Sequence, residues 1–154
     1  MTSFNFLLVD DEKPFIETMA QRLHQRGFKV SCAFSGMEAQ NRLEEDDTID
    51  VVVLDIQMPG FDGVKMVETI KKKHPLVEII MLTGHASINS AIEALKFGAF
   101  DYLTKPCDIN DLISKAKQAA SRKKEREAKI LSVRLRLYIS ARERDELISK
   151  ILET

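Results

Sequence analysis

The chain has 154 residues, enough for one domain with a hydrophobic core and a short appendage. Its 44% hydrophobic and 31% charged residues are typical of globular proteins, and a formal net charge of −1 gives no overall bias toward nucleic acid or anionic membranes. No apolar run approaches the roughly 20 residues that cross a bilayer, and no signal-peptide pattern is present. The cysteines, Cys32 and Cys107, have no metal-binding spacing. We therefore expect reduced thiols and a cytoplasmic protein with no nucleic-acid or membrane partner.

Five short apolar runs predict buried strands, and the amphipathic segments between them predict helices. The runs lie at residues 4–9, 28–34, 51–54, 77–82 and 100–103. Helix boundaries are indicated by Pro14 in a first turn, by Gly27 after a last turn, and by a capping box that begins at Ser35. Strands that alternate with helices require a parallel sheet covered on both faces. We predict an α/β fold, a flavodoxin-like (βα)5 doubly wound sheet with strand order 2-1-3-4-5.

Polar residues follow four of the predicted strands. The strand order brings five of them to one edge of the sheet: Asp10, Asp11, Asp55, Thr83 and Lys105. Three carboxylates in a small space need a countercharge, which Mg²⁺ and the Lys105 ammonium could supply. Together with the Thr83 hydroxyl, these groups form a holder for the outer oxygens of a phosphoryl group. Asp55, directly after a buried strand, is then the nucleophile.

Four separated motifs agree with this arrangement: Asp10-Asp11, the stretch from Leu54 to Gly63 around Asp55, Thr83-Gly84-His85-Ala86, and Tyr102-Leu103-Thr104-Lys105-Pro106. In order and spacing they resemble the receiver domain of bacterial two-component response regulators, over about residues 4–120. The resemblance implies that Asp55 accepts a phosphoryl group from a sensor histidine kinase or a histidine phosphotransfer protein. It also implies that the domain then acts on a downstream protein, which the sequence does not identify.

The same resemblance assigns roles to the residues around Asp55. Asp10, Asp11, Asp55 and the backbone carbonyl of Gln57 would hold Mg²⁺. Lys105 would bind a phosphoryl oxygen, and its peptide bond to Pro106 would be cis. Thr83 and Tyr102 match the switch pair that rearranges on phosphorylation, and Gln57 and His85 occupy positions that tune hydrolysis of the acyl phosphate. Such a protein is no enzyme beyond catalysing its own aspartyl phosphorylation and dephosphorylation.

Three other functions remain open. A phosphorelay intermediate would pass the phosphoryl group onward without a regulated output of its own. A phosphatase of the haloacid-dehalogenase type also uses a strand-end aspartate and Mg²⁺, but it needs a second acid where this chain has Gln57. A flavodoxin-like cofactor binder is disfavoured because the edge is acidic and lacks a Gly/Ser/Thr-rich phosphate loop.

We expect the receiver domain to occupy residues 1–120 and a C-terminal extension to occupy residues 121–154. Residues 121–127 are wholly polar, which predicts a solvated helix or a linker. Residues 133–139 alternate apolar and polar side chains, which predicts a half-buried strand. A capping box at Ser140 predicts a short amphipathic helix after it.

This extension is too short for a helix-turn-helix or a catalytic domain. Its apolar side chains and its unpaired strand edge instead predict a docking element, and a homodimer through residues 130–154 is one form of it. The chain thus resembles a stand-alone receiver with a short strand-helix extension. A fragment of a longer protein is the alternative.

Overall fold

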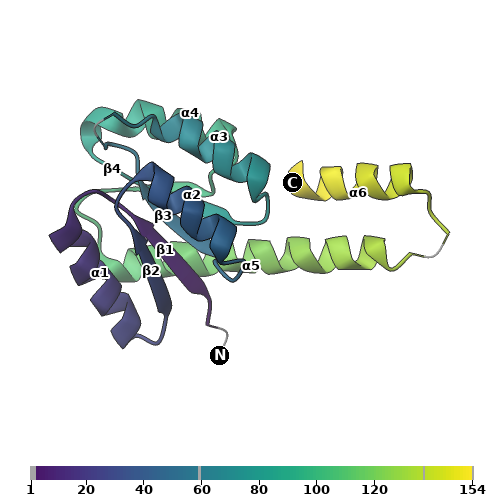
Figure 1. Ribbon diagram of the computed structural model, residues 1–154, viewed down its shortest axis with the longest axis horizontal. Helices are drawn as coiled ribbons and strands as arrows, with labels where there is room; N and C mark the ends of the chain where they lie inside the picture. Colours follow the sequence, from purple (N-terminus) through teal and green to yellow (C-terminus); the bar gives the residue numbers. More distant parts are fainter. Residues whose placement is uncertain (1–2, 59, 137, 154) are drawn as a thin grey trace.

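The computed structural model describes residues 3–58, 60–136 and 138–153, which fold around one five-stranded sheet (Figure 1). All neighbouring strands are parallel. The strands are β1 (Asn5–Val9), β2 (Lys29–Ala33), β3 (Val51–Asp55), β4 (Glu78–Thr83) and β5 (Asp101–Thr104). The helices are α1 (Lys13–Gln25), α2 (Gly36–Glu45), α3 (Gly63–Lys73), α4 (Ile88–Lys96), α5 (Ile109–Arg134) and α6 (Ala141–Glu153), with a short 3₁₀ turn, η1 (His85–Ser87), before α4. The order β2-β1-β3-β4-β5 confirms the predicted topology.

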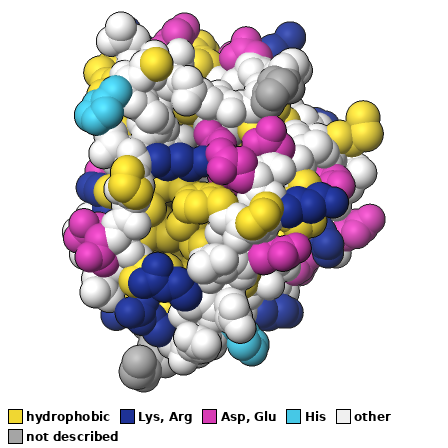
Figure 2. Space-filling model, turned by 90° about the vertical axis from the view of Figure 1, so that its left-hand side faces the viewer, with side chains coloured by type: hydrophobic (Ala, Val, Ile, Leu, Met, Phe, Trp, Pro, Cys, Tyr) yellow, Lys and Arg dark blue, Asp and Glu magenta, His cyan; other side chains and the backbone are white. Residues whose placement is uncertain are grey.

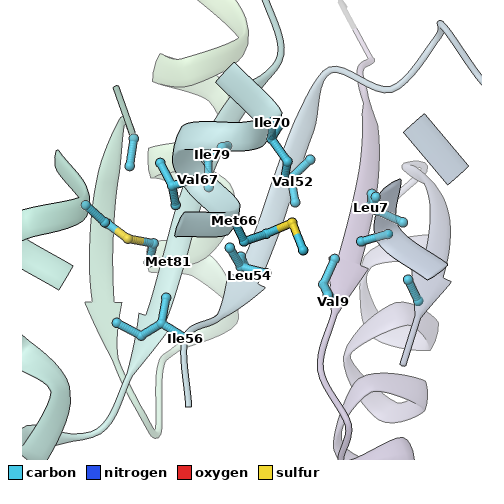
Figure 3. Close-up of a cluster of buried hydrophobic side chains, with 14 of the residues drawn as sticks. Leu7, Val9, Val52, Leu54, Ile56, Met66, Val67, Ile70, Ile79 and Met81 are labelled. Carbon is cyan, nitrogen blue, oxygen red and sulfur yellow. The ribbon is translucent and has the colours of Figure 1, made fainter. Parts of the chain in front are cut away.

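The two faces of the sheet carry separate hydrophobic clusters. In β1, Leu7 and Val9 pack in the cluster that includes α2, α3 and α4, whereas Phe6 and Leu8 pack in the cluster that includes α1 and α5. Figure 3 shows the first cluster, in which Met66 and Val67 of α3 lie over the strands. Because both faces are covered, the central strands β1, β3 and β4 are nearly continuous apolar runs in the sequence.

A glycine allows α3 to approach the end of β3 closely. A Cβ on Gly63 would lie 2.6 Å from Cβ of Ile56, the residue after β3. The preceding residue, Asp62, begins the helix, because its Oδ1 accepts a hydrogen bond from the Lys65 amide at 3.1 Å. These two residues hold the loop that follows Asp55 against the body of the domain.

The prediction of a strand at residues 133–139 is wrong. α5 continues through Arg134, the residues at 135–136 and 138–139 form no strand, and Leu137 lies outside the described residues. A lone strand here would leave its backbone N–H and C=O groups unpaired, whereas a helix satisfies its own. The apolar residues fit the helix: Ile130 and Val133, three positions apart, are both buried. The extension is therefore a helical hairpin.

The second helix of that hairpin is where the sequence predicts it. The Oγ of Ser140 accepts a hydrogen bond from the Glu143 amide at 3.1 Å, which confirms the predicted cap of α6. α6 runs back alongside the part of α5 that extends beyond the sheet (Figure 1). α5 is unbroken at residue 120, where the sequence predicts the receiver to end. In the described part of the chain, no helix is both long and apolar enough to cross a membrane.

Candidate functional site at the carboxyl ends of the strands

The polar side chains predicted to meet at one edge of the sheet come from four strands. Asp55 and Thr83 are the last residues of β3 and β4, and Asp10 and Lys105 directly follow β1 and β5. Figure 2 shows the side of the molecule on which these strands end. Acidic side chains gather near the middle of that face, next to Lys or Arg side chains and an apolar area.

Lys105 connects two buried carboxylates. Its Nζ lies 2.9 Å from Oδ2 of Asp10 and 3.1 Å from Oδ2 of Asp55, and both carboxylates are almost completely buried. The same Nζ lies 4.6 Å from the centre of the Phe15 ring, a distance at which a cation is attracted to the ring face. The peptide bond from Lys105 to Pro106 is cis, as the resemblance implied.

The electrostatics of the two central groups follow from this geometry. Burial raises the pKa of the Asp55 carboxyl, and the Asp10 carboxylate acts in the same direction, against the opposing effects of Lys105 and of the Gln57 amide, which donates to Oδ1 at 2.9 Å. Burial alone would lower the pKa of Lys105, but its hydrogen bonds with Asp10 and Asp55 outweigh burial and raise it. Lys105 therefore remains a fixed positive charge beside a destabilised carboxylate.

The acidic cluster is suited to a hard divalent cation. One oxygen from each of Asp10, Asp11 and Asp55 can be chosen so that all three lie within 4.8 Å of one another. Asp11 is exposed, so the cluster is open to solvent on one side. Lys105 alone cannot neutralise three carboxylates, and Mg²⁺ prefers such oxygen ligands together with waters and phosphate.

The remaining predicted residues surround this centre. Thr83 is fully buried, and its hydroxyl donates to the Gly84 carbonyl at 2.9 Å. Tyr102 lies opposite Met81 in the pairing of β4 with β5 and packs against the hydrophobic cluster beneath α3 and α4. Gln57 and His85 are exposed near the ends of β3 and β4.

A family profile for the response regulator receiver domain matches residues 6–117, which is most of the chain. The chain belongs to this family. The matched region contains β2 to β5, all of β1 except its first residue, and every site residue considered above. We therefore reject the two alternative interpretations, a phosphatase and a cofactor-binding protein, since receiver domains are regulatory domains and not classical enzymes.

Several relatives extend this result. The chain is 37% identical over 129 residues to the regulatory protein AtoC of Escherichia coli, in a match that covers 81% of this chain and 28% of AtoC. A crystal structure of a response regulator receiver domain protein from Clostridium thermocellum is 37% identical, has a TM-score of 0.75, and is matched over 79% of this chain and 97% of that one. The crystal structure of NtrX from Brucella abortus is 30% identical, with a TM-score of 0.78, over 97% of this chain and 34% of NtrX.

The curated relatives are much longer than this chain. It spans about a quarter of the length of the curated relatives, 28% of AtoC and 25% of an NtrX-like regulator of Rickettsia felis. The match to Brucella NtrX covers nearly the whole chain and thus includes most of the C-terminal hairpin. The helical extension therefore has a structural counterpart in a larger regulator.

Sequence reasoning missed two neighbours of Lys105. Glu12 places Oε1 3.8 Å from Nζ, and Phe15 lies beneath the ammonium. Both lie within five residues of Asp10, at the start of α1. Their closeness in sequence to the end of β1 could have predicted that they lie near the site. The two cysteines are free, as predicted, and burial raises the pKa of both thiols.

Proposed function

We propose that this receiver accepts a phosphoryl group on Asp55 from the phosphohistidine of a histidine kinase or phosphotransfer protein. The observation that carries the proposal is the position of Lys105 Nζ, 2.9 Å from Asp10 and 3.1 Å from Asp55, at the end of the central strand. An oxygen of Asp55 attacks phosphorus, the new O–P bond forms as the P–N bond breaks, and the electron pair of that bond returns to the imidazole.

The surrounding residues prepare this transfer. Asp55 is held by the Gln57 amide on one oxygen and by Lys105 on the other, so its orientation is fixed before the donor arrives. The Lys105 ammonium then contacts a phosphoryl oxygen and balances the charge that the transfer brings. Mg²⁺ held by Asp10, Asp11, Asp55 and the Gln57 carbonyl would neutralise the remaining negative charge.

Thr83 and Tyr102 are the proposed switch. An acyl phosphate on Asp55 offers new acceptors to the Thr83 hydroxyl, which now donates only to the neighbouring Gly84 carbonyl. Movement of Thr83 vacates space for the Tyr102 ring and changes the surface formed by α4, β5 and α5. Gln57 and His85, exposed beside the site, set the rate at which water removes the phosphoryl group.

The proposal is tested by labelling with acetyl phosphate in the presence of Mg²⁺. Wild type should gain one phosphoryl group that hydroxylamine removes, and Asp55→Asn should gain none. Asp62→Asn is the matched control, because Asp62 is an exposed aspartate in the following loop and asparagine also caps helices. Labelling of Asp55→Asn at the wild-type level would refute the assignment.

The C-terminal hairpin supports a second part of the proposal, a homodimer or docking contact through residues 130–154. Leu131, Leu135 and Tyr138 are exposed apolar side chains near the tip of the hairpin. Burying a side chain of this size contributes about 1.5–3 kcal/mol. Across a symmetric contact six such side chains are buried, and their summed free energy only moderately exceeds the association cost of roughly 4–15 kcal/mol. We therefore expect a weak contact, micromolar or weaker.

A further inference from the structure

At the opposite edge of the sheet from Asp55, three cations surround one buried carboxylate. Glu78, the first residue of β4, is fully buried. Its Oε1 accepts from Lys71 at 3.3 Å, from Arg122 at 3.0 Å and from Arg126 at 3.5 Å, and its Oε2 accepts from Arg122. A single carboxylate cannot neutralise three cations, so the cluster carries excess positive charge in a poorly solvated place.

Arg126 is the least satisfied member of this cluster. Its side chain is only 7% exposed, its one contact with Glu78 is the longest of the set, and its Nε finds no acceptor among the residues that the structure describes. Lys71 has more hydrogen-bond acceptors than Arg126, because its Nζ also donates to the carbonyls of Pro75 and Val77 at 2.8 and 2.9 Å. Buried guanidinium donors without an acceptor are costly, so the absence of a partner calls for an explanation.

The cations lie along a cleft large enough for a small molecule. The cleft has a volume of about 710 Å³ and is lined by the ends of α3 and α4, by α5 and by the end of α6. Lys96 adds positive charge at its rim, whereas Lys72 is paired with Glu68 at 2.9 Å, and Glu153 is the other acidic residue of the lining. Figure 1 shows α6 turned back so that its end lies near α3. The volume falls within the range of pockets that hold small ligands.

We propose that this cleft is a binding site for a small phosphate-bearing anion, separate from the phosphoryl-acceptor site at Asp55. Guanidinium groups present planar pairs of donors that match phosphate oxygens, and lysines at the rim supply point charges. Burial lowers the pKa of Arg126, and repulsion from Arg122 acts in the same direction, against the opposing effect of the Glu78 carboxylate. The donors that would hold the anion come from α3, α4 and α5, whereas α6 contributes only Leu152 and Glu153 to the lining.

The test uses the whole chain with inorganic pyrophosphate in EDTA, so that the acidic site holds no metal. Calorimetry should show saturable binding that weakens with added salt. In nitrogen–proton NMR spectra the Arg126 Nε–H signal should shift, together with amides near Gly98. Arg126→Gln should weaken binding by about tenfold, since it removes charge-assisted hydrogen bonds.

Two further variants keep the test decisive. Lys96→Glu alters only an exposed rim residue, so it should fold normally and weaken binding severalfold even if Arg126→Gln is unstable. Lys124→Gln is the matched control, because Lys124 is exposed on α5 and does not line the cleft, and its affinity should equal that of wild type. Absence of saturable binding, or equal affinity in all variants, overturns the proposal. Tighter binding of an acidic peptide than of pyrophosphate would also overturn it and assign the cleft to a protein contact.

Discussion

Replacing Glu78 with glutamine should destabilise the receiver more than the loss of any other single ion-pairing side chain in the described part of the chain. Glu78 is fully buried, and its partners Lys71 and Arg126 are 13% and 7% exposed. Glutamine keeps the shape of the side chain but leaves three cations around a neutral amide. Removing one partner from a buried ion pair costs about 3–5 kcal/mol, because the remaining charge stays uncompensated. In a domain of this size that loss lowers Tm by roughly 6–20 °C.

Urea unfolding followed by circular dichroism measures this loss directly. The midpoint should fall while the slope stays unchanged, since the same surface is exposed on unfolding. Asp101→Asn is the control: Asp101 pairs with Lys115 at 2.6 Å, but both side chains are about one-third exposed, so the loss should stay below about 1 kcal/mol. Amide exchange should also rise in residues 121–134 of Glu78→Gln. A Glu78→Gln protein within about 1 kcal/mol of wild type would refute the account of the cluster.

Three further predictions concern the phosphoryl site and the hairpin. Asp11→Ala should weaken Mg²⁺ binding at least about tenfold in an NMR titration while leaving Tm unchanged, because Asp11 is exposed; an unaltered titration contradicts the proposed ligand set. Thr83→Ala should still accept phosphate from acetyl phosphate but lose the phosphorylation-induced NMR shifts around Tyr102, and retention of those shifts argues against the switch. In sedimentation velocity, Leu131→Lys/Leu135→Lys should abolish concentration-dependent association that Met37→Lys, a change at a still more exposed residue of α2, leaves intact. Monomeric wild type would exclude the homodimer.

The sheet and its order could be predicted from the sequence because the three central strands, β1, β3 and β4, are short apolar runs bounded by turn or capping residues. Runs such as Val51–Leu54 are buried on both faces, which only a central strand of a covered parallel sheet allows. The edge position of Asp55 and Lys105 then follows from topology alone. Their distances do not, because side-chain separations depend on packing such as that of Phe15 beneath the ammonium.

The C-terminal extension was harder to predict, because local patterns there have two interpretations. The alternation at residues 133–139 fits a strand, but a strand needs a partner that the sequence does not reveal. The polar stretch 121–127 reads as solvated, yet Arg122 and Arg126 reach Glu78 and Lys123 reaches Asp50 at 2.7 Å. These partners lie between 44 and 73 residues away in sequence, beyond the reach of any local pattern.

β4 connects the two charged sites of this receiver. It begins at Glu78, in the cluster that holds α5, and ends at Thr83, the proposed switch residue, which directly follows the strand partner of Asp55, Leu82. All six of its residues are buried, and it lies between β3 and β5, so its ends are joined by a rigid element of roughly 17 Å. A rigid strand transmits a signal only if it has two positions, and the Thr83–Tyr102 switch is the proposed source of the second. Glu78→Gln should then leave labelling of Asp55 unchanged but uncouple α5 exchange from phosphorylation. Equal phosphorylation-induced protection of residues 121–134 in that variant and wild type would show that β4 does not carry the signal.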